Sequence, residues 1–360
     1  MNKTIPLVYA TDNNYALPTA VSIASALESA NIDTVYDIYV IVGGDFSRIN
    51  EKRINQVLEK YPKHKITFFN MQDQYKNSNI NTKYITIATY YRLQIASLLE
   101  NLNKCIYIDS DTFVAKDLSE LYNENIDDKY IAGVRAAGYL IPDKTKETMN
   151  ELELPNIDQY INAGIILFNL DNIRKDNMES VFHSLIPKNY KDQDQSILNK
   201  ACYGKIKILN LKFNAGTPHS LLDSESYNTR EWLRMAFTKE EWDYARLNPV
   251  IVHYVGTIKP WNKITSDYAD LWWICASKLP FFDDILIEYK SSISELWNII
   301  PNYKKEISSK EEAIKKLTEE KKSVEREIGE IRASKTYKIG RLVTFLPRKV
   351  RAAIWKLRKK

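Results

Sequence analysis

Two aspartates, Asp109 and Asp111, end an apolar run in the stretch CIYIDSDTFV, residues 105–114. Such a run predicts a strand of a largely buried parallel sheet, and open α/β sheets bind ligands at the carboxyl ends of their strands. Two carboxylates so close repel each other, so a divalent cation or a positively charged ligand between them would stabilise the pair. Asp-Ser-Asp is also common turn chemistry. The pair therefore indicates either a metal or phosphate site or an ordinary turn.

Strand-like and helix-like patterns alternate on both sides of these acids. Strands are predicted at residues 4–11, 36–44, 65–71 and 105–111, and helices at residues 18–31, 49–62 and 89–101. Later in the chain, residues 159–170 predict a strand with an Asn-Ala-Gly corner, and residues 248–261 predict a strand that runs into a Gly and Pro turn. Between them, a loop entering a helix is predicted at residues 191–202. This alternation is typical of a doubly wound α/β sheet of the nucleotide-binding kind.

A glycine-rich loop is not available to bind phosphates. The chain contains neither GxGxxG nor GxxxxGK(S/T), and it has only 10 glycines in 360 residues. These loops bind phosphate through closely spaced backbone N–H groups, which need glycine. A bound cation is therefore the expected means of holding a diphosphate.

The charged residues are distributed unevenly along the chain. Residues 331–360 contain eleven Lys or Arg and no acid, so the preceding residues are net acidic although the whole chain has a charge of +5. An acidic body disfavours nucleic-acid binding. Cys105, Cys202 and Cys275 are widely spaced and odd in number, which favours a reducing compartment over a disulfide framework or zinc cluster. No leader or bilayer-spanning segment is predicted, so we expect a cytoplasmic protein.

The carboxyl-terminal residues show two further patterns. Apolar residues at heptad positions a and d occur at Ile307, Ile314, Leu317, Val324, Ile328 and Ile331. With Lys310 and Lys321 as gaps, they predict a short coiled coil or helical stalk at 301–335 that could form a homo-oligomer. Residues 336–360 place apolar residues at helical spacing among basic ones, which predicts docking on an anionic membrane surface. Packing of this tail on the acidic body is the alternative.

Several separated motifs occur in a fixed order along the chain. They are YATDNNY at 9–15, TYYRL at 89–93, IDSD at 108–111, NAG at 162–164, DQSILN at 194–199 and HYVGTIKPW at 253–261. Together they resemble the retaining glycosyltransferases of family 8, over roughly residues 5–265. The resemblance implies a GT-A type nucleotide-sugar-binding α/β sandwich around a mixed sheet, followed by a helical carboxyl-terminal extension. It also implies a UDP-sugar donor and Mn²⁺, with Mg²⁺ as the alternative ion.

The resemblance also suggests domain boundaries. We expect a catalytic domain at residues 1–265 and a helical end of the body at 266–300. The stalk at 301–335 and the basic tail at 336–360 follow.

By resemblance, Asp109, Asp111 and His253 are the metal ligands. Mixed oxygen and nitrogen ligation suits Mn²⁺ better than Mg²⁺. Gly256 would let the backbone approach a phosphate, and Lys259 would offer it a cation. The other donor-binding residues implied by the resemblance are Ala10, Thr11, Asp12, Asn13, Asn14, Tyr15, Arg92, Ser110, Asn162 and Ala163. A surface ion pair is the alternative role for Arg92.

Asp194 and Gln195 are the expected catalytic residues. Asp194 would bind sugar hydroxyls, and Gln195 would lie nearest the anomeric carbon. The neighbouring Asp192 and Gln193 offer an alternative register, but DQSILN keeps the family's spacing to Asn199. An amide oxygen is a weak nucleophile, so Gln195 would either attack or stabilise an oxocarbenium-like centre.

Some positions depart from the family pattern. Arg135 and Ala136 stand where some relatives carry acids that contact the acceptor or the sugar, and Tyr84 stands where a relative has histidine. The identity of the acceptor therefore does not follow from the resemblance. The donor hexose, glucose or galactose, also stays open.

The expected reaction is transfer of a hexose from UDP-glucose or UDP-galactose, with an α linkage, to a glycan or lipid-linked acceptor. We expect this transfer to contribute to the synthesis of cell-surface polysaccharide, lipopolysaccharide or glycoprotein glycans. A phosphohydrolase or phosphotransferase with an Asp-x-Asp pair is one alternative, but Phe113 stands where such enzymes need Thr or Val. A non-catalytic nucleotide-binding scaffold is the other, and the presence of all three metal-ligand side chains argues against it.

Overall fold

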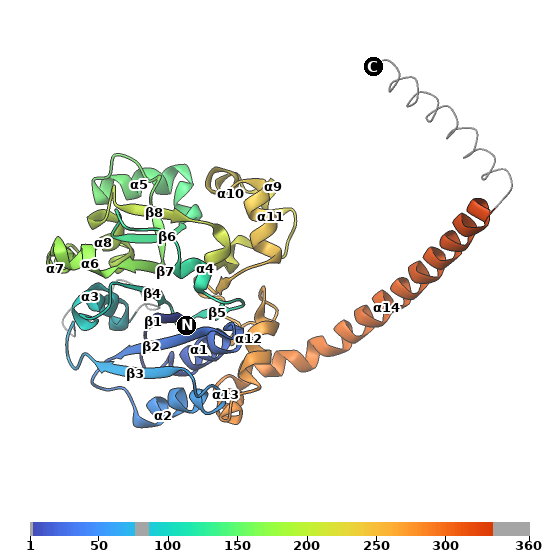
Figure 1. The fold of residues 1–360 in the computed structure, drawn as a ribbon, viewed down its shortest axis with the longest axis horizontal. Helices are drawn as coiled ribbons and strands as arrows, with labels where there is room; N and C mark the ends of the chain where they lie inside the picture. Colours follow the sequence, from blue (N-terminus) through green and yellow to red (C-terminus); the bar gives the residue numbers. More distant parts are fainter. Residues whose placement is uncertain (1–2, 76–85, 334–360) are drawn as a thin grey trace, which may run out of the picture. The chain divides into compact units, whose positions relative to one another are not determined.

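The computed structural model describes residues 3–75 and 86–333 (Figure 1). The chain divides into two compact units, Met1–Ile293 and Ser294–Lys360. Tyr84 and the basic tail at 336–360 lie outside the described residues, so the predictions made for them stay predictions.

A mixed sheet of seven strands forms the centre of the first unit, in the order β3-β2-β1-β4-β7-β6-β8 (Figure 1). Its strands are β1 (Lys3–Ala10), β2 (Thr34–Val42), β3 (Lys65–Asn70), β4 (Lys104–Ile108), β6 (Ile131–Arg135), β7 (Ile161–Asn169) and β8 (Ile206–Leu209). The strands β1 to β4 are parallel, whereas β7 runs antiparallel to both β4 and β6. The start of β7 therefore lies at the same sheet edge as the ends of β1 and β4, where ligands bind in open sheets.

Alternating side chains of the strands fill two apolar cores, one on each face of the sheet. On β1, Ile5, Leu7 and Tyr9 face one core, while Val8 and Ala10 face the other. Every one of these side chains is buried. The period of two along a strand explains why an uninterrupted apolar run marks a strand that is covered on both faces.

Helices cover both faces of the sheet. The α-helices are α1 (Ala16–Ser29), α2 (Arg48–Gln56), α3 (Ile95–Leu98), α4 (Ser119–Tyr122), α5 (Pro142–Leu152), α6 (Leu170–Lys175), α7 (Met178–Leu185), α8 (Gln193–Ala201), α9 (Ser226–Thr229), α10 (Glu231–Ala236), α11 (Lys239–Leu247), α12 (Ala269–Ala276), α13 (Phe282–Glu288) and α14 (Lys290–Ala333). The 3₁₀ helices are η1 (Val57–Lys60), η2 (Ile87–Gln94), η3 (Ala137–Leu140), η4 (Ile186–Lys188), η5 (Leu211–Phe213) and η6 (Thr217–His219). Helices α1 and α12 pack on the core of Leu7, whereas η2, α6 and α8 pack on the core of Val8.

A second, three-stranded sheet lies beside the first. It has the order β5-β10-β9 and consists of β5 (Thr112–Val114), β10 (Ile251–His253) and β9 (Ala215–Gly216). The turn from Asp109 to Asp111 joins β4 of the large sheet to β5 of the small one. Strand β10 pairs antiparallel with β5, and this register puts His253 opposite Thr112. The small sheet therefore brings a distant histidine beside the two aspartates.

One helix prediction was partly wrong. Residues 89–101 were expected to form one α-helix, but the structure has the 3₁₀ helix η2 over Ile87–Gln94 and a single turn of α-helix, α3, after it. A 3₁₀ helix this long is uncommon. Within it, Arg92 Nε donates to the carbonyl oxygen of Thr89, three residues earlier, while the rest of the guanidinium binds Ala163 in β7 and Asp109 in the turn after β4. These tertiary contacts favour the tighter winding over a regular α-helix.

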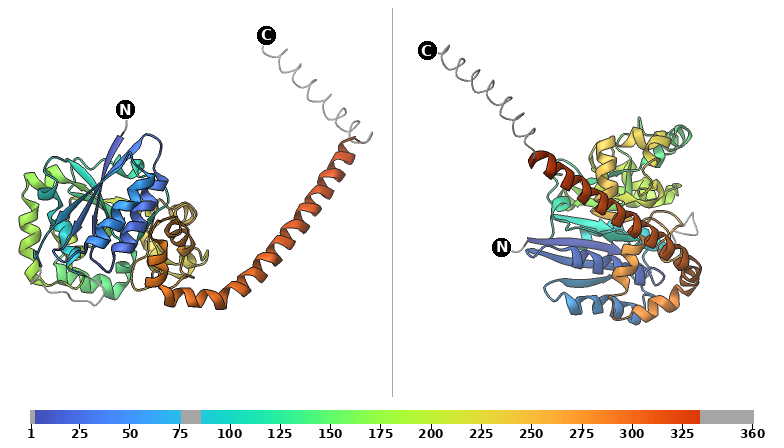
Figure 2. Two further views of the ribbon diagram at one scale, coloured as in Figure 1. Left: turned by 90° about the horizontal axis from the view of Figure 1, so that it is seen from below. Right: turned by 90° about the vertical axis from the view of Figure 1, so that its right-hand side faces the viewer.

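The predicted stalk region is helical as far as the structure describes it. Helix α14 is continuous from Lys290 to Ala333 (Figure 2). Its apolar residues Ile314, Leu317, Val324 and Ile328 are all exposed. No helix among the described residues is long and apolar enough to cross a membrane. Association of two such helices stays a prediction.

Candidate active site and metal centre

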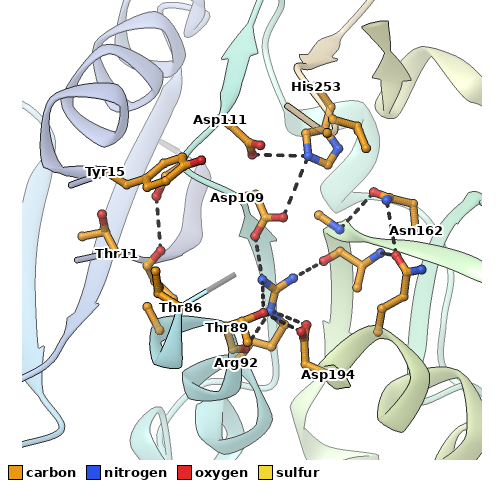
Figure 3. A pocket seen from close by; sticks show the side chains of 18 of the residues that line it. Thr11, Tyr15, Thr86, Thr89, Arg92, Asp109, Asp111, Asn162, Asp194 and His253 are labelled. Carbon is orange, nitrogen blue, oxygen red and sulfur yellow. Dashed lines mark hydrogen bonds and ion pairs between the residues drawn. The ribbon is translucent and has the colours of Figure 1, made fainter. Parts of the chain in front are cut away.

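A cavity of about 590 Å³ opens at the sheet edge where β1 and β4 end and β7 begins (Figure 3). This volume lies in the range of roughly 300–1,000 Å³ that is usual for small-molecule sites. Of the residues predicted to bind donor or metal, those that line it are Ala10, Thr11, Asp12, Tyr15, Arg92, Asp109, Ser110, Asp111, Asn162, Ala163, Asp194, Gln195, His253, Gly256 and Lys259. Asn13 and Asn14 lie outside this set. The structure therefore brings together residues from all six separated motifs.

Asp109, Asp111 and His253 form a group whose potential ligand atoms all lie within 4.8 Å of one another. His253 Nε2 is 3.3 Å from Asp111 Oδ1 and 3.9 Å from Asp109 Oδ2. Pairing of β5 with β10 holds this arrangement, because the backbone N–H of Tyr254 donates to the carbonyl oxygen of Asp111. Two carboxylates and one imidazole so close together are a donor set that could hold a divalent metal ion.

Lys259 also reaches the aspartate pair. Its Nζ donates to the carboxylate of Asp111 and to the carbonyl oxygen of Tyr254, and the residue is 6% exposed. Although burial opposes ionisation, the Lys259 ammonium and His253 hold the pKa of Asp111 well below its usual range. Gly256, with φ of +82°, makes the turn between β10 and Lys259 in a conformation that favours glycine. The strand and the turn together deliver one imidazole and one ammonium to the same carboxylate.

Arg92 is buried between two acids rather than paired on the surface. Its Nη2 lies 2.8 Å from Asp109 Oδ1, and its Nε lies 3.0 Å from Asp194 Oδ2 (Figure 3). Nη1 donates to the carbonyl oxygen of Ala163, and the guanidinium lies over the ring of Tyr107. A surface ion pair, the alternative considered for Arg92, is therefore excluded. The guanidinium fixes the positions of a predicted metal ligand and a predicted catalytic acid.

The two predicted catalytic residues occupy the first turn of α8 and face the cavity. Burial raises the pKa of Asp194, while Arg92 and the hydroxyl of Thr89 oppose that effect. Gln195 Oε1 accepts hydrogen bonds from the backbone N–H of Ala163 at 3.1 Å and from Asn162 Nδ2 at 3.3 Å. Of the alternative register, Asp192 also lines the cavity, but Gln193 is buried and does not.

The loop that follows β1 lines another part of the cavity. Asp12 Oδ1 accepts the backbone N–H groups of Asn14 and Tyr15, which closes the turn into α1. Asn13 turns away from the cavity, since its side chain bonds to the backbone of Asp45 and Ser47. Asp12 and Tyr15 both line the cavity. Asn13 is thus placed to hold the loop itself.

Three residues of this region were not found by sequence reasoning. Thr89 and Tyr107 donate to Asp194 and Asp109, respectively, and Asn214 contacts both His253 and Asn162. The position of Gly164 has a steric reason, since a Cβ atom there would lie 2.1 Å from Cε1 of His253. Thr89 and Gly164 lie within quoted motifs, so a signal existed for them. Asn214, in LKFNAG, belongs to no motif.

Known proteins resemble this chain in sequence. The family model described as Glycosyl transferase family 8 matches residues 6–265. General stress protein A of Bacillus subtilis (strain 168) is 29% identical over 275 residues, covering 72% of this chain and 88% of that protein. Lipopolysaccharide 1,3-galactosyltransferase of Salmonella typhimurium is 28% identical over 262 residues, covering 71% and 72%. Lipopolysaccharide 1,2-glucosyltransferase of Escherichia coli is 25% identical over 276 residues, covering 74% and 77%.

Solved structures share the fold. The apo structure of the bifunctional glycosyltransferase WbbM aligns with a TM-score of 0.68 at 25% identity, covering 80% of this chain and 52% of that one. This chain therefore spans about half of WbbM. Galactosyltransferase LgtC, in complex with donor and acceptor sugar analogs, aligns with a TM-score of 0.63 at 23% identity, covering 77% and 96%. The predicted GT-A type α/β fold is confirmed, and this chain belongs to glycosyl transferase family 8.

Proposed function

We propose that this chain is a metal-dependent retaining hexosyltransferase that uses UDP-glucose or UDP-galactose. The observation that carries the proposal is the convergence of Asp109, Asp111 and His253 in the cavity that also holds Asp194 and Gln195. Membership of a glycosyltransferase family supports sugar transfer as the reaction class. The galactosyl- and glucosyltransferase names of two relatives support a hexose donor.

The residues at the cavity have complementary roles in this proposal. Asp109, Asp111 and His253 would hold Mn²⁺, or Mg²⁺ as the alternative, and the bound ion would neutralise charge on the leaving diphosphate. Asp12 and Tyr15 would bind the uracil ring, and Lys259 would donate to a phosphate oxygen. Asp194, held by Arg92 and Thr89, would accept hydrogen bonds from sugar hydroxyls.

The contacts of Gln195 favour stabilisation over nucleophilic attack. Both lone pairs of its Oε1 already accept hydrogen bonds, from Ala163 and Asn162, which lowers the nucleophilicity of that oxygen. We therefore propose that the bond from the anomeric carbon to the phosphate oxygen breaks as the acceptor hydroxyl oxygen bonds to that carbon on the same face. The hydroxyl proton passes to the leaving phosphate oxygen. The product would keep the α configuration.

The first test measures UDP-sugar hydrolysis and transfer with and without Mn²⁺. Asp111→Asn should lower turnover by at least about a hundredfold, because charge stabilisation of the leaving group supplies much of such a rate. Chelation should do the same to the unmodified enzyme. The control is Asp127→Asn, since Asp127 is exposed and does not line the cavity. Activity that survives both treatments, or a β-linked product by NMR, would contradict the proposal.

The acceptor and the place of action are also part of the proposal. The lipopolysaccharide relatives support a glycan or lipid-linked acceptor in cell-surface glycan synthesis. We propose work at the cytoplasmic membrane face, where the basic tail would bind anionic lipid. The exposed apolar residues Ile314, Leu317, Val324 and Ile328 support self-association of α14. Flotation of the full chain and of a chain ending at Ile331 with anionic vesicles tests the first idea, and analytical ultracentrifugation tests the second.

A further inference from the structure

Asn214 is a buried residue outside the cavity that touches two of its walls. It lies between η5 and β9 and is 3% exposed. Its Oδ1 lies 3.0 Å from Nδ1 of His253, and its Nδ2 lies 2.8 Å from Oδ1 of Asn162. Asn162 Nδ2 in turn lies 3.3 Å from Gln195 Oε1. The side chains of Asn214, Asn162 and Gln195, which we call the amide chain, thus connect the histidine to the catalytic amide.

Two backbone N–H groups fix the direction of every bond in the amide chain. Gly164 N donates to Asn162 Oδ1, and Ala163 N donates to Gln195 Oε1, each over 3.1 Å. Because a backbone N–H can only donate, both side-chain atoms must be acceptor oxygens. Asn162 must then turn its Nδ2 toward Gln195. Asn214 must likewise present its own Nδ2 to Asn162 Oδ1.

This direction requires a proton on Nδ1 of His253. Asn214 Oδ1 is left facing Nδ1 of His253, so Nδ1 must be the donor. Nε2 then faces Asp111 and Asp109, at 3.3 and 3.9 Å, and is the nitrogen left to bind a metal. Imidazole binds a metal through its unprotonated nitrogen, and the partner of the other nitrogen selects the tautomer. The ring lies directly against the backbone of Gly164, which leaves no space for a Cβ atom.

We propose that Asn214 is a positioning residue that sets the tautomer of His253 and, through Asn162, the orientation of Gln195. One buried amide would thereby couple the metal end of the cavity, at His253, to its sugar end, at Gln195. The proposal deepens the metal-dependent transfer proposed above and rests on it for its catalytic consequence.

Two substitutions separate the two contacts of Asn214. Asn214→Leu removes both, so His253 should move its proton to Nε2, where a carboxylate can accept it. Asn214→Asp keeps an acceptor for Nδ1–H but cannot donate to Asn162. We expect Asn214→Leu to lower Mn²⁺ affinity by about 10- to 100-fold, the usual effect of losing such a partner. Asn214→Asp should keep Mn²⁺ affinity and lower kcat more than it changes the KM for the donor.

The tautomer can be read without metal, donor or turnover. The chain has only four histidines, so ¹⁵N NMR of labelled, metal-free protein at roughly pH 8.5, above the ordinary histidine range, can resolve their ring nitrogens. His64 is an internal reference of the opposite kind, because its Nδ1 accepts the backbone N–H of Tyr36. We expect a proton on Nδ1 of His253 in the unmodified protein and in Asn214→Asp, and its loss from Nδ1 in Asn214→Leu.

Mn²⁺ affinity is then measured by electron paramagnetic resonance in the absence of donor. The matched control is Asn210→Leu, an exposed asparagine four residues away that caps η5. Thermal unfolding of the metal-free variants identifies any that do not fold, and Asn214→Asp keeps the test open if Asn214→Leu is one of them. An Asn214→Leu protein with the unmodified tautomer and Mn²⁺ affinity would overturn the proposal, as would equal effects of Asn214→Asp on metal binding and kcat.

Failure of the two proposals can be told apart. If His253 responds to Asn214→Leu as expected but the unmodified protein turns over no UDP-sugar, the proposed function fails and the role of Asn214 in setting the tautomer stands. If transfer is metal-dependent but Asn214→Leu changes neither the protonation of His253 Nδ1 nor the Mn²⁺ affinity, the positioning role is wrong and the proposed function stands.

Discussion

The pocket has two ends that are held by different forces. At the metal end, Asp109, Asp111, His253 and Lys259 are held mainly by opposite charges and by Arg92 behind Asp109. At the sugar end, the amide chain is held by neutral hydrogen bonds whose direction two backbone N–H groups determine. An ion pair keeps most of its attraction after a small shift but loses it when one partner is removed. A network of amide hydrogen bonds is broken when a single donor is exchanged for an acceptor. The two ends should therefore respond differently to substitution.

Replacing Arg92, whose guanidinium contacts both Asp109 and Asp194, should have the largest effect on the free energy of unfolding. Arg92→Met leaves Asp109 and Asp194 without their buried partner, and breaking such a pair costs about 3–5 kcal/mol of unfolding free energy. Urea unfolding followed by circular dichroism measures it. Arg53→Met is the matched control, because its partner Asp284 is 43% exposed and such pairs contribute less than about 1 kcal/mol. Equal losses in the two variants would show that burial of the pair does not matter.

A methyl group can test how tightly the metal end is built. Gly164→Ala would place a Cβ atom 2.1 Å from His253 Cε1, so the imidazole ring or the backbone at residue 164 must shift. We expect Mn²⁺ affinity to fall by about 10- to 100-fold, as when a ligand loses its orientation. Isothermal calorimetry of Mn²⁺ titrated into the metal-free protein measures the change. Gly138→Ala, whose Cβ atom would meet nothing within 4 Å, should leave the affinity unchanged.

The smallest of these effects concerns Lys259, whose substitution should raise the affinity for one ligand and lower the affinity for another. Lys259→Met removes the cation that pairs with Asp111, so the affinity for Mn²⁺ without nucleotide should rise. The affinity for UDP at saturating Mn²⁺ should fall about tenfold, which corresponds to one charge-assisted hydrogen bond of roughly 1.5 kcal/mol. Calorimetry of each ligand separates the two. A parallel fall of both affinities, or the same result for the exposed Lys278→Met, would contradict a specific exchange of Lys259 between carboxylate and phosphate.

The sequence was informative wherever one residue type suits a role by itself. Carboxylates after a buried strand are costly without a partner, so Asp109 and Asp111 were noticeable, and the family motif added His253. The strands were predictable because their apolar runs require cover on two faces. The 3₁₀ winding around Arg92 was not, because helical periodicity does not reveal bonds to Ala163 and Asp109.

Asn214 shows why part of the site could not be predicted. Asparagine is ordinary in loops, and both partners of its side chain lie far away in the chain, 39 and 52 residues from it. Its role appears only when β7, β9 and β10 are placed together. Similarly, the motif NAG marks Gly164, but only the position of the imidazole explains why a larger residue does not fit.

The link between β4 and β5 has a consequence for the order of folding. The Lys259–Asp111 contact spans 148 residues of chain, and strand β10 must dock beside β5 before Lys259 and His253 can contact Asp111. Contacts between such distant residues close loops at a high entropic cost and form late. During synthesis Asp111 therefore emerges long before Lys259 and His253, whereas Arg92, the partner of Asp109, precedes both aspartates. We expect the nascent chain to acquire metal affinity only when β10 has docked, so that metal binding reports completion of the fold.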